Sequence, residues 1–417
     1  MTVDAPPQRT VVRALRFVPE AERVSFTPDA PQAPPANRIV VAIGLVLAVA
    51  LVWVVARTAG PIMAGTSALG LALGFTLFHS RFGFTSGWRQ LAAVGQGAAV
   101  RAHMLMLATA TISLAGTPKP SVAAVGIPLL VGAFLFGIGM QVGGSCASGT
   151  LFAVGSGQTA VVLTLFGFIV GSVLAALTFT FWTVTVPAGT PISLAETFGY
   201  PGALGLSLLV MATIVAITYV VARRRTPPPV ERPPSARGIA RVLRGSWPMW
   251  VGAIVLAVLN AGVLFVSGGA WGVTSAFGLW GGKVLSGLGV DVASWAYFQV
   301  PANAKALQGS VFADRISVLD FGVIVGALVA SALGGAFVLH KRVPWKLALG
   351  SVLGGIAMGY GARLAGGCNI GAYFSGIASF SLHGWIWGVV ALGGTFVGLR
   401  LRPLFGLTNP KPSDSIC

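Results

Sequence analysis

The sequence predicts an all-α polytopic membrane protein with about ten transmembrane helices. Of the 417 residues, 55% are hydrophobic and only 9% are charged, whereas about a quarter of the residues in soluble domains are charged. Ten apolar runs have close to the length of about 17 to 25 residues that spans a bilayer, and polar segments separate them. Because lipid accepts only backbone whose polar groups are paired internally, helices are the expected element.

The apolar runs lie on both sides of a basic, proline-rich linker. Their positions are near residues 39–57, 62–79, 100–116, 121–141, 158–184, 200–222, 247–267, 316–340, 345–362 and 383–400. The remaining assignments are an N-terminal arm at 1–38, a separate anchor at 39–57, a connecting helix at 200–222, a linker at 223–246 and a C-terminal tail at 401–417.

The net charge of +17 arises from 27 Lys and Arg residues against 10 Asp and Glu residues. In a soluble protein this balance would suggest nucleic acid, but here most of the charge lies in tails and loops, where it contacts the lipid bilayer and sets orientation. The segment from Arg223 to Ser246 carries seven arginines and one glutamate. We therefore predict that this linker and both termini are cytoplasmic and that the chain does not bind nucleic acid.

One glycine-framed cysteine motif occurs twice. The segment GMQVGGSCASG at 139–149 aligns without gaps with GARLAGGCNIG at 361–371, at an offset of 222 residues. This offset sets Cys146 on Cys368, two of only three cysteines, and Gln141 on Arg363. A weaker match at an offset of 189 sets RFGFTSGW at 81–88 on AWGVTSAF at 270–277, which predicts a long outer loop around 280–313.

The two motifs predict two four-helix repeats, at 62–184 and 247–400, joined by one connecting span. A single connecting span inverts the second repeat, and inverted repeats bring equivalent segments to the membrane midplane from opposite faces. With the orientation above, the Cys146 loop enters from the cytoplasm and the Cys368 loop from outside. We therefore expect an hourglass with re-entrant half-helices at its waist.

The chemistry of the loops indicates a small sulfur-containing anion. Glycines permit sharp turns, and the first amides of a half-helix suit an anion. A neutral thiol adds a weak donor and a polarisable contact. A buried cysteine often serves packing alone, but packing gives no reason for matched cysteines in two loops. The candidate substrate-binding residues are Cys146, Cys368, Gly144, Ser145, Gly149, Gly367, Asn369, Gly371, Arg363 and Gln141.

Other polar and aromatic residues receive weaker assignments. Arg363 is expected to pair with Asp320 or to reach the interface. Lys283, Lys305 and Arg315 are expected at the outer entrance. Interfacial or exposed positions are expected for His79, His103, His340, His383, Trp385, Trp387 and Cys417. Because no C-x-x-C pair, nucleotide-binding motif or catalytic constellation occurs, we expect no cofactor, no metal site and no enzymatic activity.

The segments GGSCASGTLFAVGSG, ARLAGGCNIGAYFSGIASFSLHGW and SRFGFTSGWR resemble the YeeE/YedE sulfur-transport family of bacterial inner-membrane proteins. The resemblance covers roughly residues 62–406. It implies an hourglass of inverted halves through which thiosulfate passes by successive S–H hydrogen bonds, here from Cys146 and Cys368. It also implies a small cytoplasmic sulfur carrier as a possible partner. The chain departs from the family pattern at Gly83, where members commonly have cysteine, and at Ala153 and Ser156, near which they carry a basic and an acidic residue.

The leading hypothesis is a transporter or channel-like permease for thiosulfate or a related small sulfur anion. A thiol-redox or sulfur-relay protein that uses Cys146 and Cys368 is the alternative from the enzyme class. A membrane scaffold without transport activity is the third reading, and the internal repeat speaks against it.

Overall fold

The computed structural model describes residues 33–114, 121–225, 227, 234–339 and 342–409. Most of the N-terminal arm, part of the basic linker, His340 and Cys417 lie outside the described residues. Up to the linker, the elements are α1 Arg38–Ala59, α2 Pro61–Ser80, α3 Phe84–Val94, α4 Ala98–Leu114, β1 Ala124–Val125, α5 Ile127–Val142, α6 Ala147–Gly155, α7 Thr159–Leu177, η2 Phe181–Thr185, β2 Thr190–Pro191 and α8 Leu194–Arg225.

The second part of the chain repeats this helical character. Its elements are α9 Ala240–Arg244, α10 Met249–Ser267, α11 Thr274–Gly287, η3 Val292–Ser294, α12 Ala296–Gln299, α13 Pro301–Gln308, η4 Val311–Ala313, α14 Arg315–Leu333, α15 Trp345–Leu364, η5 Asn369–Phe374, α16 Ser375–Ala378, α17 Leu382–Leu401 and η6 Arg402–Phe405. The strands β1 and β2 form one antiparallel pair in which Ala124 lies opposite Pro191.

Within the described residues, nine helices are long and apolar enough to cross a membrane. They include α1, α7, α8, α10, α14 and α17, and each coincides with a predicted run. The predicted span at 100–116 is α4, which has 17 residues and so a length of about 26 Å. The chain is therefore a multi-pass, all-α membrane protein, as predicted.

Local sequence explains where several of these helices begin and end. Asn37 caps α1, because its Oδ1 accepts a hydrogen bond from the Val40 amide at 3.2 Å. Gly60, at a φ of +84°, separates α1 from α2. Asp314 caps α14, since its Oδ2 accepts a hydrogen bond from the Ser317 amide at 2.8 Å. Such side chains satisfy backbone donors that a helix start leaves unpaired.

The helices of the two halves pack in matching pairs. The helix before each cysteine packs against the long helix after the other cysteine, so that α5 contacts α17 and α15 contacts α7, while α5 and α15 contact each other. Likewise α2 packs on α14, α10 packs on α4, and α2 contacts α10. These contacts map onto one another when α2 is exchanged with α10, α4 with α14, α5 with α15 and α7 with α17.

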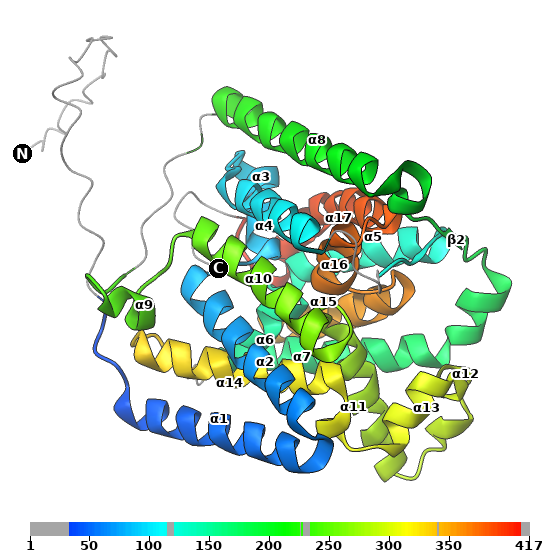
Figure 1. Ribbon diagram of the computed structural model, residues 1–417, viewed down its shortest axis with the longest axis horizontal. Coiled ribbons are helices and arrows are strands. Elements are labelled where there is room, and N and C mark those ends of the chain that lie inside the picture. Colours follow the sequence, from blue (N-terminus) through cyan, green and yellow to red (C-terminus); the bar gives the residue numbers. More distant parts are fainter. Residues whose placement is uncertain (1–32, 115–120, 226, 228–233, 340–341, 410–417) are drawn as a thin grey trace, which may run out of the picture.

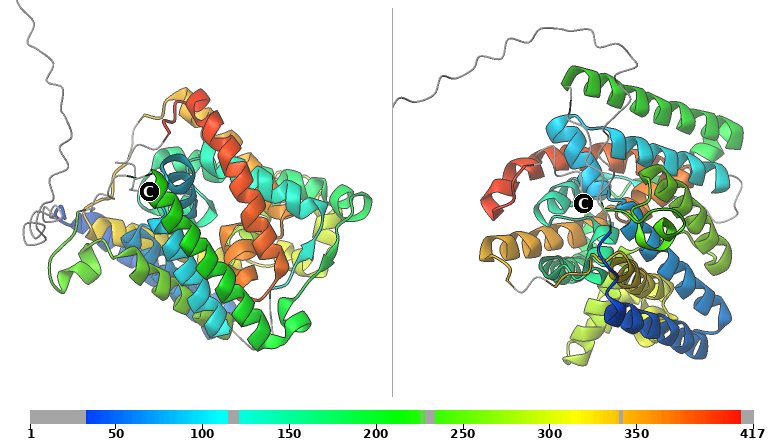
Figure 2. Two further views of the ribbon diagram at one scale, coloured as in Figure 1. Left: turned by 90° about the horizontal axis from the view of Figure 1, so that it is seen from above. Right: turned by 90° about the vertical axis from the view of Figure 1, so that its left-hand side faces the viewer.

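Two long helices lie at opposite edges of this bundle. Helix α8 runs along one edge beside α4, and α1 runs along the opposite edge beside α14 (Figures 1 and 2). In the most apolar 18-residue stretch of each helix, only 17% of the residues of α8 and 11% of those of α1 are buried. Apolar side chains that face outward at both edges are suited to lipid.

The segment around 280–313, which we predicted to be a long outer loop, is largely helical. It contains the end of α11, the turns η3 and η4, and the short helices α12 and α13. Tyr297 and Phe298 of α12 are buried in a small apolar cluster with Val292 and with Ala176 of α7. The loop prediction was wrong because aromatic residues in this segment find an apolar surface that only the folded chain provides.

Glycine permits the close approach of α15 to α7. A Cβ atom on Gly359 would overlap the carbonyl oxygen of Phe168. We predict that Gly359→Val lowers the free energy of unfolding by roughly 1–3 kcal/mol, the usual cost of overpacking. Thermal unfolding in detergent measures the loss. Gly393→Val is the matched control in α17, because a Cβ there has no neighbour within 4 Å. Equal stability of the two variants would contradict the prediction.

Candidate functional site

The Cys146 motif folds into a tight turn between two helices. Helix α5 ends at Val142, and Gly144 adopts a φ of +83°, which favours glycine. Cys146 then caps α6, where the Thr150 amide donates to the Cys146 carbonyl oxygen at 2.7 Å. The hydroxyl groups of Ser145 and Thr150 are 2.7 Å apart. As expected, a short helix begins directly after the cysteine.

The Cys368 motif makes a turn of the same kind. Helix α15 ends at Leu364, and Gly366 and Gly367 have φ values of +70° and +143°. Cys368 caps the π-helical turn η5, and the Trp387 Nε1 donates to the Gly367 carbonyl oxygen at 3.2 Å. Trp387 is fully buried, so our assignment of this residue to the lipid interface was wrong.

Both thiols lie inside the protein. Cys146 is 1% exposed and Cys368 is 0% exposed, and both are free. The helices that they cap, α6 and η5, contact each other. The two cysteines belong to one buried cluster and are close enough to interact electrostatically. The fold thus brings two motifs 222 residues apart in sequence into one interior region.

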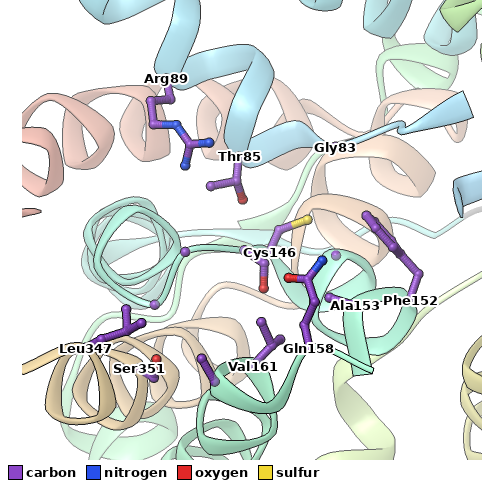
Figure 3. Close-up of a pocket in the computed structure, with 15 residues that line it drawn as sticks. Gly83, Thr85, Arg89, Cys146, Phe152, Ala153, Gln158, Val161, Leu347 and Ser351 are labelled. Atoms are coloured by element: carbon purple, nitrogen blue, oxygen red, sulfur yellow. The ribbon is translucent and has the colours of Figure 1, made fainter. Parts of the chain in front are cut away.

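A cavity of about 210 Å³ opens beside Cys146. Its walls come from the start of α3, the α5–α6 turn, the start of α7 and the first turns of α15, as Figure 3 shows. The lining residues are Gly83, Thr85, Arg89, Gly143, Gly144, Ser145, Cys146, Gly149, Phe152, Ala153, Gln158, Ala160, Val161, Leu347 and Ser351. Thus four candidates, Gly144, Ser145, Cys146 and Gly149, share this cavity.

Arg89 is the charged residue of the cavity wall, and its guanidinium group points toward the cavity near Thr85 and Cys146 (Figure 3). It is only 9% exposed. A guanidinium group in an apolar setting attracts anions strongly. Our candidate set omitted Arg89, although the residue closes the SRFGFTSGWR motif. A charged residue in a membrane-embedded segment is costly and therefore marks a candidate functional residue. Because Arg89 lies in none of the predicted spans, this signal did not point to it.

Two of the predicted binding residues hold the starts of short helices. Gln141 Nε2 donates to the Thr85 carbonyl oxygen at 3.3 Å, at the start of α3. Arg363 donates to the carbonyl oxygens of Thr274 at 2.8 Å and Ser275 at 3.0 Å, at the start of α11. The aligned residues Gln141 and Arg363 therefore bond to the aligned residues Thr85 and Thr274. Both contacts position a helix start.

An arginine also lies at a similar place on α3 and beside α11, although the two arginines are not aligned in sequence. The offset of 189 sets Arg89 on Gly278. A Cβ atom on Gly278 would lie 3.0 Å from a terminal nitrogen of Arg363. In the first half the guanidinium group comes from the short helix, and in the second half it comes from the helix before the cysteine. Arg363 thus lies beside the α11 position that the offset aligns with Arg89 of α3.

The remaining candidates surround Cys368. Asn369 is buried, and its Nδ2 lies 4.0 Å from the sulfur of Met140 on α5. A Cβ atom on Gly371 would lie 4.0 Å from the Cα atom of Gly272, and one on Gly367 would lie 2.8 Å from the Ala372 amide nitrogen.

Several weaker assignments need correction. Asp320 does not pair with Arg363, because neither of its carboxylate oxygens has a hydrogen-bond partner. His79, His103 and His383 are buried within the protein and do not face lipid or solvent. Lys283 lies in α11 and donates to the carbonyl oxygens of Leu307 and Gly309 at 2.7 and 2.6 Å. Arg315 donates to the carbonyl oxygens of Gly269 and Ala270, each at 2.8 Å. Both side chains therefore hold backbone. Their expected place at the outer entrance, with that of the exposed Lys305, stays a prediction.

Comparison with known proteins identifies the family of this chain. A family model described as sulphur transport matches residues 79–397. The probable transporter YedE of Escherichia coli (strain K12) is 33% identical over 167 residues, which are 38% of this chain and 41% of that protein, so this match spans less than half of the relative.

Two relatives are named thiosulfate transporter TsuA. The protein of Escherichia coli (strain K12) is 27% identical over 335 residues, covering 76% of this chain and 88% of the relative. The protein of Spirochaeta thermophila is 27% identical over 341 residues, covering 76% of this chain and 92% of the relative. Since the family model covers more than half of the chain, this protein belongs to the YeeE/YedE sulphur-transport family of membrane transporters.

Proposed function

We propose that the protein is a channel-like permease for thiosulfate or a related small sulfur-containing anion. The single observation that carries this proposal is the cavity in which Cys146 and Arg89 lie together. The two relatives named thiosulfate transporter TsuA support the same substrate class, because their matches to this chain cover most of each relative's length. The cavity volume is about 210 Å³, whereas one water molecule occupies about 30 Å³ in liquid water. The cavity therefore has room for a small anion.

The groups of the cavity suit the two ends of such an anion. Arg89 and the first amides of α6 favour the negatively charged oxygens. The Cys146 thiol offers a weak S–H donor and a polarisable contact to a terminal sulfur. Ser145 and Gly149 complete the turn that lets backbone approach the anion. Phosphate and chloride lack the terminal sulfur, so the thiol should favour thiosulfate over them.

The passage from Cys146 to Cys368 is the narrow part of the proposed path. Both thiols are buried, and the helices that they cap contact each other. In this mechanism the anion exchanges one S–H donor for the other as it moves. Gly367, Asn369 and Gly371 would form the second binding turn, while Gln141 and Arg363 hold α3 and α11 in position.

The matching contacts of the two halves support an inverted repeat. The pairs α5–α17 and α15–α7 exchange under the sequence correspondence, as do α2–α14 and α10–α4. We propose that 62–184 and 247–400 are the two repeats, with an hourglass path between them. The place of Arg363 beside Gly278, the residue that aligns with Arg89, also supports this assignment.

We propose the bacterial inner membrane as the location, with both termini and the linker 223–246 in the cytoplasm. The cavity lies where α7 and α15 begin, next to the basic loop before α15. The positive-inside rule assigns that end to the cytoplasm. A small cytoplasmic sulfur carrier that receives the substrate there stays a prediction.

Uptake of radiolabelled thiosulfate into proteoliposomes tests this function. We expect saturable uptake that unlabelled thiosulfate inhibits much more strongly than sulfate or phosphate, because only thiosulfate presents a terminal sulfur to the thiols. Protein-free liposomes are the control. A protein that folds, inserts and yet transports neither thiosulfate, sulfite nor selenite would contradict the proposal. Mass-tagging of both cysteines in the same samples detects a disulfide or persulfide, the products expected of a sulfur relay.

A further inference from the structure

Asp320 of α14 is a buried acid that the proposed path does not use. It is 0% exposed, and neither carboxylate oxygen has a hydrogen-bond partner. An ionised carboxylate without partners is very unfavourable in an apolar interior, whereas the neutral acid is tolerated. In this conformation the group is therefore expected to carry a proton.

The side of α14 that bears Asp320 faces the protein interior. One turn earlier, Ile316 reaches to 3.4 Å from the position of a Cβ atom on Gly272. Two turns later, Ala327 lies 3.1 Å from the position of a Cβ atom on Gly155 of α6. Residues at these spacings share one helix face. Asp320 thus lies between the short helices of the two halves, close enough to Cys368 for an electrostatic interaction.

The Ser317 hydroxyl lies along α14 between Asp320 and the partly exposed start of the helix, without a hydrogen bond to Asp320 itself. Asp314, the half-buried cap of the helix, accepts a hydrogen bond from the Ser317 hydroxyl at 2.7 Å. Trp280 Nε1 in turn donates to the Ser317 oxygen at 2.9 Å. Asp314, Ser317 and Asp320 follow each other at intervals of three residues, a spacing at which helical side chains are neighbours. This series leads from the predicted outer surface to the interior.

Among the residues that the structure describes, no basic group is bonded to Asp320. Two titratable groups interact with it electrostatically, Asp314 on the same helix and Cys368 across the interior. The cations on elements that pack against α14 bond to backbone elsewhere or are exposed. They are Lys283 on the Leu307 and Gly309 carbonyls, Arg315 on the Gly269 and Ala270 carbonyls, Arg244 on the Leu333 carbonyl, Arg241 on the Ser246 carbonyl, and the exposed Arg38 and Arg57. The buried His79 lies in the last turn of α2, which also packs against α14.

We propose that Asp320 is a proton-binding site that couples anion movement to a proton. This inference rests on the proposed function and adds its driving force. A proton from the Asp314 side adds to a carboxylate oxygen of Asp320, and the same proton leaves when the acid ionises toward the other side. An anion at Cys368 disfavours the ionised acid, because like charges repel. Anion and proton therefore occupy the constriction together, and by linkage each favours the binding of the other.

Proteoliposomes with an imposed pH gradient test the coupling. For the wild type, we expect thiosulfate uptake to rise severalfold when the outside is more acidic than the inside. Asp320→Asn should lose this dependence but retain exchange of labelled for unlabelled thiosulfate. Asp320→Glu should retain the dependence. Asp291→Asn, which removes an exposed acid on the same predicted side, should behave as the wild type.

The outcomes separate this inference from the proposed function. Wild-type uptake that ignores the pH gradient would overturn the coupling and leave the permease assignment intact. Infrared spectroscopy supplies a second readout that does not require transport, since a protonated acid has a carbonyl stretching band that a carboxylate lacks. We expect Asp320→Asn to remove such a band. If the variant protein is folded and the band is absent from the wild type, the proposal is wrong.

Discussion

Cys368→Ala is expected to reduce thiosulfate uptake at least about tenfold while the protein remains folded. The thiol is fully buried at the proposed constriction, so its loss removes the S–H donor from an anion there. A missing partner for a buried charged group costs about 1.4 kcal/mol or more, which corresponds to about a tenfold change in rate. Initial rates in proteoliposomes, normalised to reconstituted protein, measure the effect.

Two further cysteine variants define the control for this result. Cys417→Ala removes the third cysteine, in the C-terminal tail, and should leave uptake unchanged. Cys368→Ser keeps a hydroxyl donor but removes the polarisable sulfur, so its rate should fall between those of the wild type and Cys368→Ala. If Cys368→Ala transports within twofold of the wild type and has an unchanged melting temperature, the two-thiol path is incorrect.

Arg89→Gln is expected to raise the KM for thiosulfate at least about tenfold. The substitution retains an amide donor but removes the positive charge from the cavity wall. Hydrogen bonds to charged groups contribute about 1.5–3 kcal/mol, equivalent to roughly ten- to hundredfold in affinity. Concentration-dependent uptake separates KM from the maximal rate, and Arg89→Lys should recover part of the affinity because it keeps the charge.

Arg101→Gln is the matched control for this charge change. Arg101 lies in a groove between α4, α8 and α10, where it stacks over Tyr219 at 4.4 Å. Its removal changes the net charge equally but leaves the Cys146 cavity intact. We expect its KM to match that of the wild type. A similar rise in both variants would mean that overall charge, and not the cavity arginine, sets the affinity.

Most of the secondary structure was predictable because lipid imposes a simple rule. An apolar run long enough to cross the bilayer must be helical, and the predicted runs coincide with α1, α2, α4, α5, α7, α8, α10, α14, α15 and α17. Glycines and matched cysteines also indicated the two turns and the short helices that follow. These features depend on local sequence, which needs no knowledge of neighbours.

Other features depended on contacts between segments far apart in the chain. Sequence alone did not reveal that Arg89 lines the cavity with Cys146, that Trp387 is buried against the Cys368 turn, or that Arg363 bonds to the start of α11 and leaves Asp320 without a partner. Composition does not distinguish a cation at the membrane interface from a cation in a cavity. The location of the side chain depends on which helix packs beside it.

The sequence by itself determined the membrane class, the helices and the pairing of two cysteine motifs, since hydropathy and turn residues act over short stretches of chain. Only the tertiary structure decided which side chains share one interior space, because α3, α5, α6, α7 and α15 meet around the cavity from separate parts of the chain. Their meeting depends on close helix contacts through glycine, such as that of Gly359 with Phe168, and such contacts are properties of two surfaces together.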